Sequence, residues 1–129
     1  MLVVDASVAV AASFADRLDD LSPHAPVAPG LMWSEARSAL HELAWRGEIG
    51  AADASEARAR LDACPIERRD DARVGPESWR IADRLGWAKT YDAEYVALAV
   101  VLGCPLVTLD ARLRRTARRV ADVVGPSEL

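Results

Sequence analysis

The chain lacks the features that mark several classes of protein. It has two cysteines among 129 residues, too few for a small domain held together by disulfides. Its longest uninterrupted apolar run, residues 96–102, is far shorter than the ~18 to 20 residues that span a bilayer. No basic segment precedes the N-terminal apolar stretch, and Asp5 interrupts it, which argues against a secretory signal peptide. We therefore expect a cytoplasmic protein that is not anchored in a membrane.

The composition also excludes disorder and gives no global sign of a nucleic-acid-binding protein. Hydrophobic residues make up 51% of the chain and charged residues 28%, a balance that supports a folded core. The formal net charge is −4, so no overall positive charge draws the chain to nucleic acid. Lys89 is the single lysine among 16 basic residues, and this preference for arginine is typical of a GC-rich bacterial genome. The length predicts one domain, residues 1–129.

The cysteines and the tryptophans are expected to be structural. Cys64 and Cys104 are each followed by proline, and neither lies at a zinc-site spacing from the two histidines. We expect both to be buried thiols, with a single disulfide as the alternative. The tryptophans lie on or beside predicted helices, where packing in the core or in a subunit interface is favoured over base stacking by an exposed ring. They are Trp33, Trp45, Trp79 and Trp87.

Short apolar segments alternate with segments of helical periodicity along the chain. Strands are predicted at residues 2–4, near 27, at 65–67, 105–109 and 122–124. Helices are predicted at residues 6–15, 31–46, 52–63, 76–85, 90–102 and 110–120. The proline-rich residues 22–29 are predicted to be a loop around the second strand. This alternation predicts an α/β domain with a mostly parallel sheet.

Two aspartates occupy equivalent places in this pattern. Asp5 follows the first predicted strand and begins a helix, and Asp110 does the same after the fourth strand. The carboxyl ends of parallel strands lie at one edge of the sheet, which is where such folds bind ligands. Aspartate is also a favoured helix N-cap, worth ~1 kcal/mol, so a purely structural role stays open for each of them.

Two further carboxylates lie on predicted helices. Asp92 begins a helix whose following turns are apolar all round, so we expect its carboxylate to enter a buried face. A buried carboxylate needs a partner or a cation, although a helix N-terminus also favours an anion. Glu35 lies at the edge of the apolar stripe of the helix at 31–46, and by spacing alone a solvated surface residue is the simpler interpretation.

If these four carboxylates converge at one edge of the sheet, their charges require compensation. The four motifs contain no histidine, which leaves oxygen atoms as the ligands. Oxygen ligands suit a hard divalent cation such as Mg²⁺ or Mn²⁺. Ions held by carboxylates commonly act on phosphate groups, where they polarise the phosphoryl group and activate a bound water.

Four segments together resemble a known family. They are residues 3–7 (VVDAS), 35–40 (EARSAL), 91–99 (YDAEYVALA) and 106–113 (LVTLDARL). In this order and at this chain length they resemble the PIN domain, and most closely its VapC-type toxin ribonucleases of bacterial toxin–antitoxin pairs. The resemblance implies a three-layer sandwich, with a central, mostly parallel sheet flanked by helices. It also implies an endoribonuclease that uses one or two Mg²⁺ or Mn²⁺ ions, forms a homodimer and is blocked by a cognate antitoxin.

The resemblance extends to individual residues. Asp5, Glu35, Asp92 and Asp110 match the acidic quartet that carries catalysis and holds the metal in the family. Thr108 matches a supporting hydroxyl position, and Ser7 is a second candidate for such a role. The chain departs from many members at residues 111–115 (ARLRR), where a further acidic residue is missing, so we expect a second metal site to be weak or absent.

The helix after Asp110 is rich in arginine. Arg112, Arg115 and Arg119 are candidates for contacts with RNA phosphates or with an acidic antitoxin tail, because arginine binds both phosphates and carboxylates. A solvated basic face is the alternative interpretation. For the whole chain, the favoured function is an endoribonuclease toxin that cleaves RNA with metal-activated water. The alternative is a PIN-like binding module without catalysis.

Overall fold

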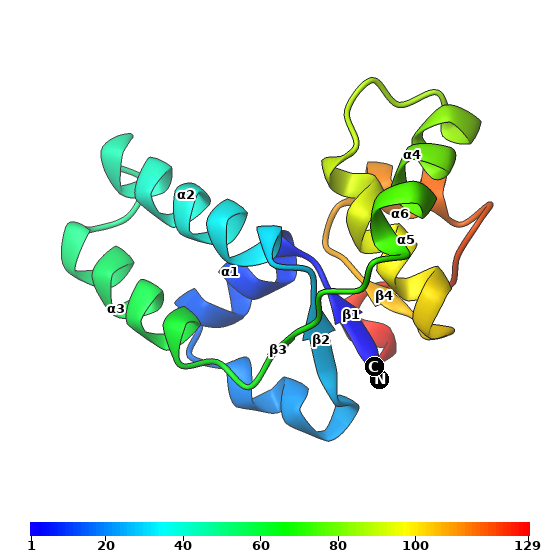
Figure 1. The fold of residues 1–129 in the computed structure, drawn as a ribbon. Coiled ribbons are helices and arrows are strands. Elements are labelled where there is room, and N and C mark those ends of the chain that lie inside the picture. The colour runs from blue at the N-terminus through cyan, green and yellow to red at the C-terminus, as the bar shows by residue number, and fades with distance from the viewer.

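A parallel sheet of five short strands lies at the centre of the computed structural model, which describes residues 1–129 (Figure 1). The strands are β1 (Leu2–Val4), β2 (Pro26–Ala28), β3 (Glu67–Arg68), β4 (Leu106–Val107) and β5 (Val123–Val124). Every neighbouring pair is parallel, in the order β3-β2-β1-β4-β5. β1 is the central strand, and its Val3 pairs with Val27 on one side and with Leu106 on the other.

Helices cover both faces of this sheet, which confirms the predicted α/β sandwich (Figure 1). α1 (Ala6–Phe14), α2 (Leu31–Trp45) and α3 (Ala51–Asp62) pack against one another on one side. α4 (Val74–Leu85), α5 (Tyr91–Leu102) and α6 (Ala111–Ala117) lie on the other side. None of these helices combines the length and the hydrophobicity that crossing a bilayer would require.

The direction of strand addition reverses next to β1. The chain adds β2 and then β3 on one side of β1, and afterwards returns across the sheet to add β4 and β5 on the other side. The connections that leave the carboxyl ends of β1 and β4 therefore diverge to opposite faces. This switch point is the place where open parallel sheets bind their ligands.

The core explains why the strands and α5 are so apolar. Val3, Val4, Leu106 and Val107 have no exposed surface, because a parallel sheet that is covered on both faces buries both sides of its strands. α5 packs against both β1 and α4, and residues 95–99 of this helix are all buried. Burial on all sides leaves this helix without the polar face that a surface helix carries.

The predicted loop at residues 22–29 is partly wrong. A 3-10 helix, η1 (Leu18–His24), occupies its first residues, and β2 then follows as predicted. Leu18 and Leu21 are both buried, and their three-residue spacing matches the period of a 3-10 helix. Pro23 fits inside η1, because its fixed φ is compatible with that conformation.

The other predicted elements are present with shifted ends. β3 begins at Glu67, two residues later than predicted, and β4 is limited to two residues. α4 begins at Val74, which places Pro76 in its first turn, where a missing N–H costs no helical hydrogen bond. α6 ends at Ala117 instead of residue 120, and a second 3-10 helix, η2 (Pro126–Glu128), follows β5.

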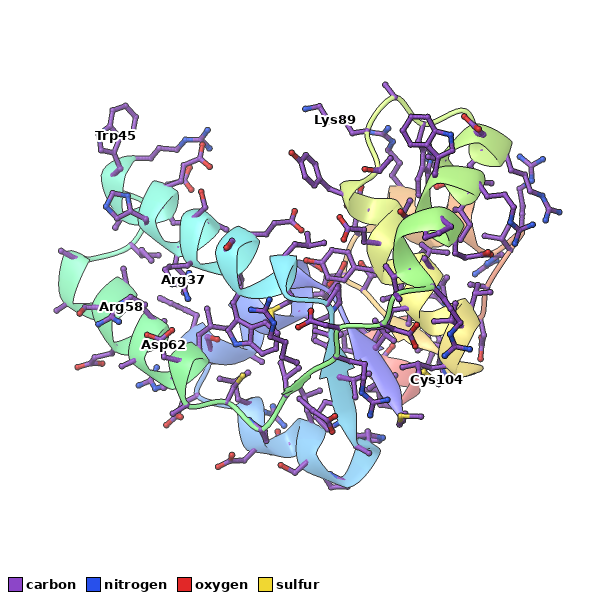
Figure 2. The ribbon with its side chains drawn as sticks, viewed as in Figure 1. Arg37, Trp45, Arg58, Asp62, Lys89 and Cys104 are labelled. Carbon is purple, nitrogen blue, oxygen red and sulfur yellow. The ribbon has the colours of Figure 1, made fainter.

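The expectations for the cysteines and tryptophans hold only in part. Both cysteines are free, and each is partly rather than fully buried. Trp45 and Trp79 are 81% and 68% exposed, so neither belongs to the core. Figure 2 shows Trp45 at the end of α2 that lies far from the sheet. Trp33 and Trp87 are partly buried and pack against the core.

We expect Leu98→Ala to lower the free energy of unfolding by about 2–5 kcal/mol, because it opens a cavity under a fully buried side chain of α5. Val100→Ala in the same helix is the matched control. Its side chain is 37% exposed, so we expect a loss of about 1 kcal/mol or less. Urea denaturation measures both values, and equal losses would contradict the central position of α5 in the core.

Candidate active site

Asp5 lies at the switch point, directly after β1. Its backbone N–H donates to the Val107 carbonyl of β4, at 3.4 Å, so the residue sits where the two central strands end. Its Oδ1 accepts the backbone N–H of Val8 at 3.1 Å, which caps the N-terminus of α1. The N-cap interpretation of Asp5 is therefore correct. The residue is only 5% exposed, however, and a buried carboxylate is an unusual choice for a cap alone.

Two neighbouring hydroxyl groups, whose oxygens lie 3.4 Å apart, each hold one oxygen of the Asp5 carboxylate. Ser7 donates to Oδ1 at 2.6 Å, and Thr108 donates to Oδ2 over a short distance. Each hydroxyl also accepts a backbone N–H: Ser7 from Leu109 and Thr108 from Asp110, both at 3.0 Å. Two of these four hydrogen bonds, Thr108 to Asp5 and the Leu109 N–H to Ser7, join the segment after β1 to the segment after β4. Ser7 and Thr108 thus both contact Asp5, and their proposed supporting role stays a prediction.

Asp110 begins α6 as its N-cap. Its Oδ1 accepts the backbone N–H groups of Arg112 at 2.9 Å and Leu113 at 3.1 Å, so the capping interpretation holds here as well. The residue is exposed, unlike Asp5. Its Oδ2 accepts no hydrogen bond within the protein, and this atom is available to a ligand.

Glu35 comes to the same place from α2. It is partly buried, and its Oε1 accepts a hydrogen bond of 2.7 Å from the hydroxyl of Tyr95 on α5. Tyr95 is 1% exposed, so this partly buried bond links helices from opposite faces of the sheet at the inner end of Glu35. Glu35 is therefore not the freely solvated surface residue that its spacing favoured.

The expectation that Asp92 enters a buried face is wrong. Asp92 is exposed, because it lies in the first turn of α5, and the continuously buried part of this helix is residues 95–99. Its carboxylate accepts no hydrogen bond from the protein. It lies on the wall of an open cavity instead, where one side of the group meets solvent and the other meets protein.

This cavity brings three of the four predicted carboxylates together. Its volume is about 560 Å³, and Glu35, Asp92 and Asp110 all line it. Asp5 does not reach the surface of the cavity, but it is close enough to raise the pKa of Glu35. The remaining walls come from the loop between α4 and α5, from the first residue of α5 and from α6. They are formed by Gly86, Trp87, Ala88, Lys89, Tyr91, Arg112, Leu113 and Thr116.

Burial and mutual repulsion raise the pKa values of these carboxyl groups. For Asp5 burial is the largest cause, opposed by hydrogen bonds from two hydroxyls and one N–H, and the Asp92 charge raises the pKa further. Burial also raises the pKa of Glu35 and outweighs the bond from Tyr95, with added repulsion from Asp92. Although Asp92 is exposed, the protein on one side of its carboxyl group displaces water and raises its pKa; the Asp110 charge raises it further, while Arg112 lowers it. The folded protein therefore disfavours the ionised form of all three carboxyl groups.

The carboxylate oxygens are suited to a hard cation, but they are too far apart to surround one in this conformation. Carboxylate oxygens from four different segments face one region, which is the chemistry that Mg²⁺ and Mn²⁺ prefer. No three Asp, Glu, His or Cys side chains stand close enough together to enclose an ion in this arrangement. Binding of an ion would therefore draw the side chains toward one another, and it would also relieve their repulsion.

The three predicted arginines are not equivalent. Arg112 lines the cavity, whereas Arg115 and Arg119 are exposed and lie outside its walls. None of the three is in an ion pair with a carboxylate of the protein, while Arg114 pairs with Glu128. A basic surface beside the cavity is therefore available to an anionic partner.

Sequence reasoning assigned no role to three residues that belong to this region. Tyr95 contacts Glu35, and Lys89 and Tyr91 line the cavity. Tyr95 follows Asp92 by three residues and so lies on the same side of the helix, which is a signal that the spacing contained. Lys89 and Tyr91 depend on the path of the loop between α4 and α5, and no periodic pattern reports that path.

Comparison with known proteins shows the family to which this fold belongs. The model of the PIN domain family matches residues 2–119. The chain is 38% identical over 120 residues to VapC ribonuclease Mb0985 of Mycobacterium bovis and to ribonuclease VapC9 of Mycobacterium tuberculosis, and the match covers 92% of this chain and of each relative. The chain therefore belongs to the PIN-domain family, and within it to the VapC-type proteins.

Solved structures show the same fold. PAE2754 from Pyrobaculum aerophilum superimposes with a TM-score of 0.79 at 26% identity, over 98% of this chain and 91% of that chain. FitAcB from Neisseria gonorrhoeae gives a TM-score of 0.64 at 18% identity, over the full length of both chains. VapBC2 from Rickettsia felis, bound to a promoter DNA fragment, gives 0.65 at 10% identity, over 97% of this chain and 98% of that chain.

We expect Thr108→Val to lower the free energy of unfolding by about 1–3 kcal/mol, because it leaves a buried carboxylate oxygen and the Asp110 N–H without a partner. Thr108→Ser keeps the hydroxyl and is the matched control. Urea denaturation of both variants measures the two free energies of unfolding. If Thr108→Ser were as unstable as Thr108→Val, the hydrogen bonds would not be what holds the two loops together.

We expect Asp92→Asn to raise the Tm at pH 7 in the presence of a chelator. Because the pKa of Asp92 is raised, the folded state binds its proton more tightly than the unfolded chain does, and ionisation lowers stability. The gain should therefore shrink as the pH falls through the raised pKa of the folded state, and it should vanish below the ordinary value of 3.8, where the carboxyl group becomes protonated in both states. Thermal melts at several pH values measure this.

Asp83→Asn is the control for loss of a charge, since Asp83 lies on the exposed side of α4 and outside the cavity. It should change the Tm little at any pH. A lower Tm for Asp92→Asn at pH 7 would show that the carboxylates do not repel one another as the geometry requires.

Proposed function

We propose that this protein is an endoribonuclease that cleaves RNA in the cavity above Asp5. The observation that carries this proposal is the convergence of Glu35, Asp92 and Asp110 in one open cavity, with Asp5 directly beneath, at the switch point of a parallel sheet. Two relatives that are 38% identical over nearly the whole chain are named ribonucleases, which supports RNA as the substrate class. One domain, residues 1–129, would carry the activity.

We propose that Asp5, Glu35, Asp92 and Asp110 hold Mg²⁺ or Mn²⁺. Their oxygen donors fit such an ion, and a positive charge would offset the repulsion that raises their pKa values. When bound, such an ion supplies charge stabilisation on the phosphate and a lowered pKa for an attacking water. Residues 111–115 add no further carboxylate to the cavity, so these four groups would be the whole acidic donor set.

The side chains around the carboxylates would fix them before the substrate binds. Ser7 and Thr108 hold both oxygens of Asp5, and Tyr95 holds one oxygen of Glu35. The second oxygen of Glu35 would then be directed to the metal or to the attacking water. Groups that are already oriented lose little freedom when the reaction begins, which lowers the barrier to phosphodiester cleavage.

We also propose two protein partners. The VapC-type family implies a cognate antitoxin, and Arg112, Arg115 and Arg119 are exposed, carry no ion pair and could each bind a carboxylate of an acidic tail through two hydrogen bonds. Because the same arginines suit RNA phosphates, an antitoxin bound there would compete with the substrate. The family resemblance also supports a homodimer as the state of the toxin.

We expect the purified protein to cleave RNA in Mg²⁺ or Mn²⁺ and to lose this activity in a chelator. Asp5→Asn and Asp92→Asn should each reduce the rate of cleavage by about 100-fold or more, because each removes a charge from the metal and phosphate site. Asp83→Asn, purified in the same way, should keep the wild-type rate. Gel analysis of defined RNAs gives the rates and the cleavage sites.

Full turnover by both Asp5→Asn and Asp92→Asn would contradict the proposed mechanism. If the wild-type protein cleaved no RNA and also bound no Mn²⁺, the non-catalytic binding module would be the better description of the chain. Binding of Mn²⁺ without cleavage would direct the search to other RNA substrates.

A further inference from the structure

We propose that Lys89 and Tyr91 form a subsite for one unpaired nucleotide of a single-stranded RNA, next to the acidic cavity. In this subsite the Tyr91 ring stacks on the base and Lys89 binds a phosphate beside it. The inference rests on the proposed function and deepens it, because it names the part of the protein that recognises the form of RNA rather than the part that cleaves it.

Lys89 and Tyr91 lie on the wall of the same cavity as the three carboxylates. Lys89 belongs to the connection between α4 and α5, which begins where Gly86 ends α4 with a φ of +72°. Figure 2 shows Lys89 on this loop, with its side chain extending away from the body of α4 and α5. Tyr91 is the first residue of α5 and directly precedes Asp92. A nucleotide held by these two side chains would therefore adjoin the bond to be cleaved.

Tyr91 has no structural partner that explains its position. It is 59% exposed, and its hydroxyl makes no hydrogen bond within the protein. By contrast, Tyr95 in the same helix is buried and bonded to Glu35. An exposed ring on a cavity wall offers a flat face on which a base can stack, and each stacked base contributes substantially to the binding of single strands.

Lys89 is a free cation at an acidic site. Neither Lys89 nor Arg112, the two basic residues of the cavity wall, is in an ion pair, although ten other arginines pair with nearby carboxylates. RNA that approaches Glu35, Asp92 and Asp110 is repelled by their charges unless cations at the rim offset them. The ammonium group of a long, flexible lysine side chain can follow a phosphate as a point charge.

A subsite of this kind selects single strands. A base that is paired in a duplex is stacked between its neighbours and cannot place its face on Tyr91, whereas a base in a loop or an open strand can. Phosphates are present in both forms, so the contribution of Lys89 should be shared by single and double strands. This difference separates the roles of the two side chains.

The test measures binding of a fluorescently labelled short single-stranded RNA, and of the same strand in a duplex, in Mg²⁺. An Asp92→Asn background prevents cleavage. In that background we expect Tyr91→Ala to raise the Kd for the single strand by about 5-fold or more and to leave the duplex unaffected. Tyr91→Phe keeps the ring and should bind like the parent. Trp79→Ala removes another exposed aromatic ring, outside the cavity, and is the matched control.

Lys89→Ala should weaken both forms of RNA and reduce the slope of log Kd against log salt by about 0.7 for the single strand, as expected for one lost phosphate contact. Lys89→Arg should keep the slope. Arg84→Ala is the matched control, because Arg84 is an exposed cation without an ion pair that lies outside the cavity wall.

The outcomes separate this inference from the proposed function. If the wild-type protein cleaves RNA but Tyr91→Ala and Lys89→Ala bind as tightly as the parent, the subsite is wrong and the ribonuclease assignment stands. If the wild-type protein does not cleave RNA and the parent does not bind it, both are wrong. The stacking role is also overturned if Tyr91→Phe binds as weakly as Tyr91→Ala, or if light scattering shows that Tyr91→Ala loses affinity because a dimer dissociates.

Discussion

The hydrogen bonds from Ser7 and Thr108 to the buried carboxylate of Asp5 connect the two central loops of the site. The Ser7 hydroxyl comes from the segment after β1, and the Thr108 hydroxyl comes from the segment after β4. Asp5 is therefore held by both segments at the place where the strand order reverses. Because each hydroxyl also accepts a backbone N–H from the loop after β4, the positions of Asp5 and Asp110 are fixed relative to each other. The remaining features of the cavity are arranged around this junction.

The carboxylates gathered at this junction destabilise the folded chain. Burial and mutual repulsion raise the pKa values of Asp5, Glu35 and Asp92, so their ionised forms oppose folding at neutral pH. The apolar sheet and α5 provide the stability that offsets this cost. Such a balance is typical of functional sites, where groups are held in an unfavourable state that a ligand or substrate relieves. A purely structural role would not require three neighbouring carboxylates to share one open cavity.

Local sequence patterns predicted the strands, the helices and the junctions between them, because these depend on residues that are close together in the sequence. The apolar strands and the strand–Asp–helix junctions at Asp5 and Asp110 follow from short-range periodicity and from the geometry of parallel sheets. The prediction that Asp92 is buried was wrong, because a helix that is apolar over most of its length still begins at the edge of the sheet. The bond between Glu35 and Tyr95 joins residues far apart in sequence, and the position of Lys89 depends on a loop, so neither was accessible to pattern reasoning.

The central claim is that the four carboxylates form one site for a divalent cation. Anomalous diffraction from crystals of the protein grown in Mn²⁺ tests it most directly, because manganese can then be located without assumptions about the ligands. We expect a peak bounded by Asp5, Glu35, Asp92 and Asp110, and no such peak in crystals of Asp92→Asn grown in the same way. A wild-type structure with manganese bound elsewhere, or with none at this position, would contradict it.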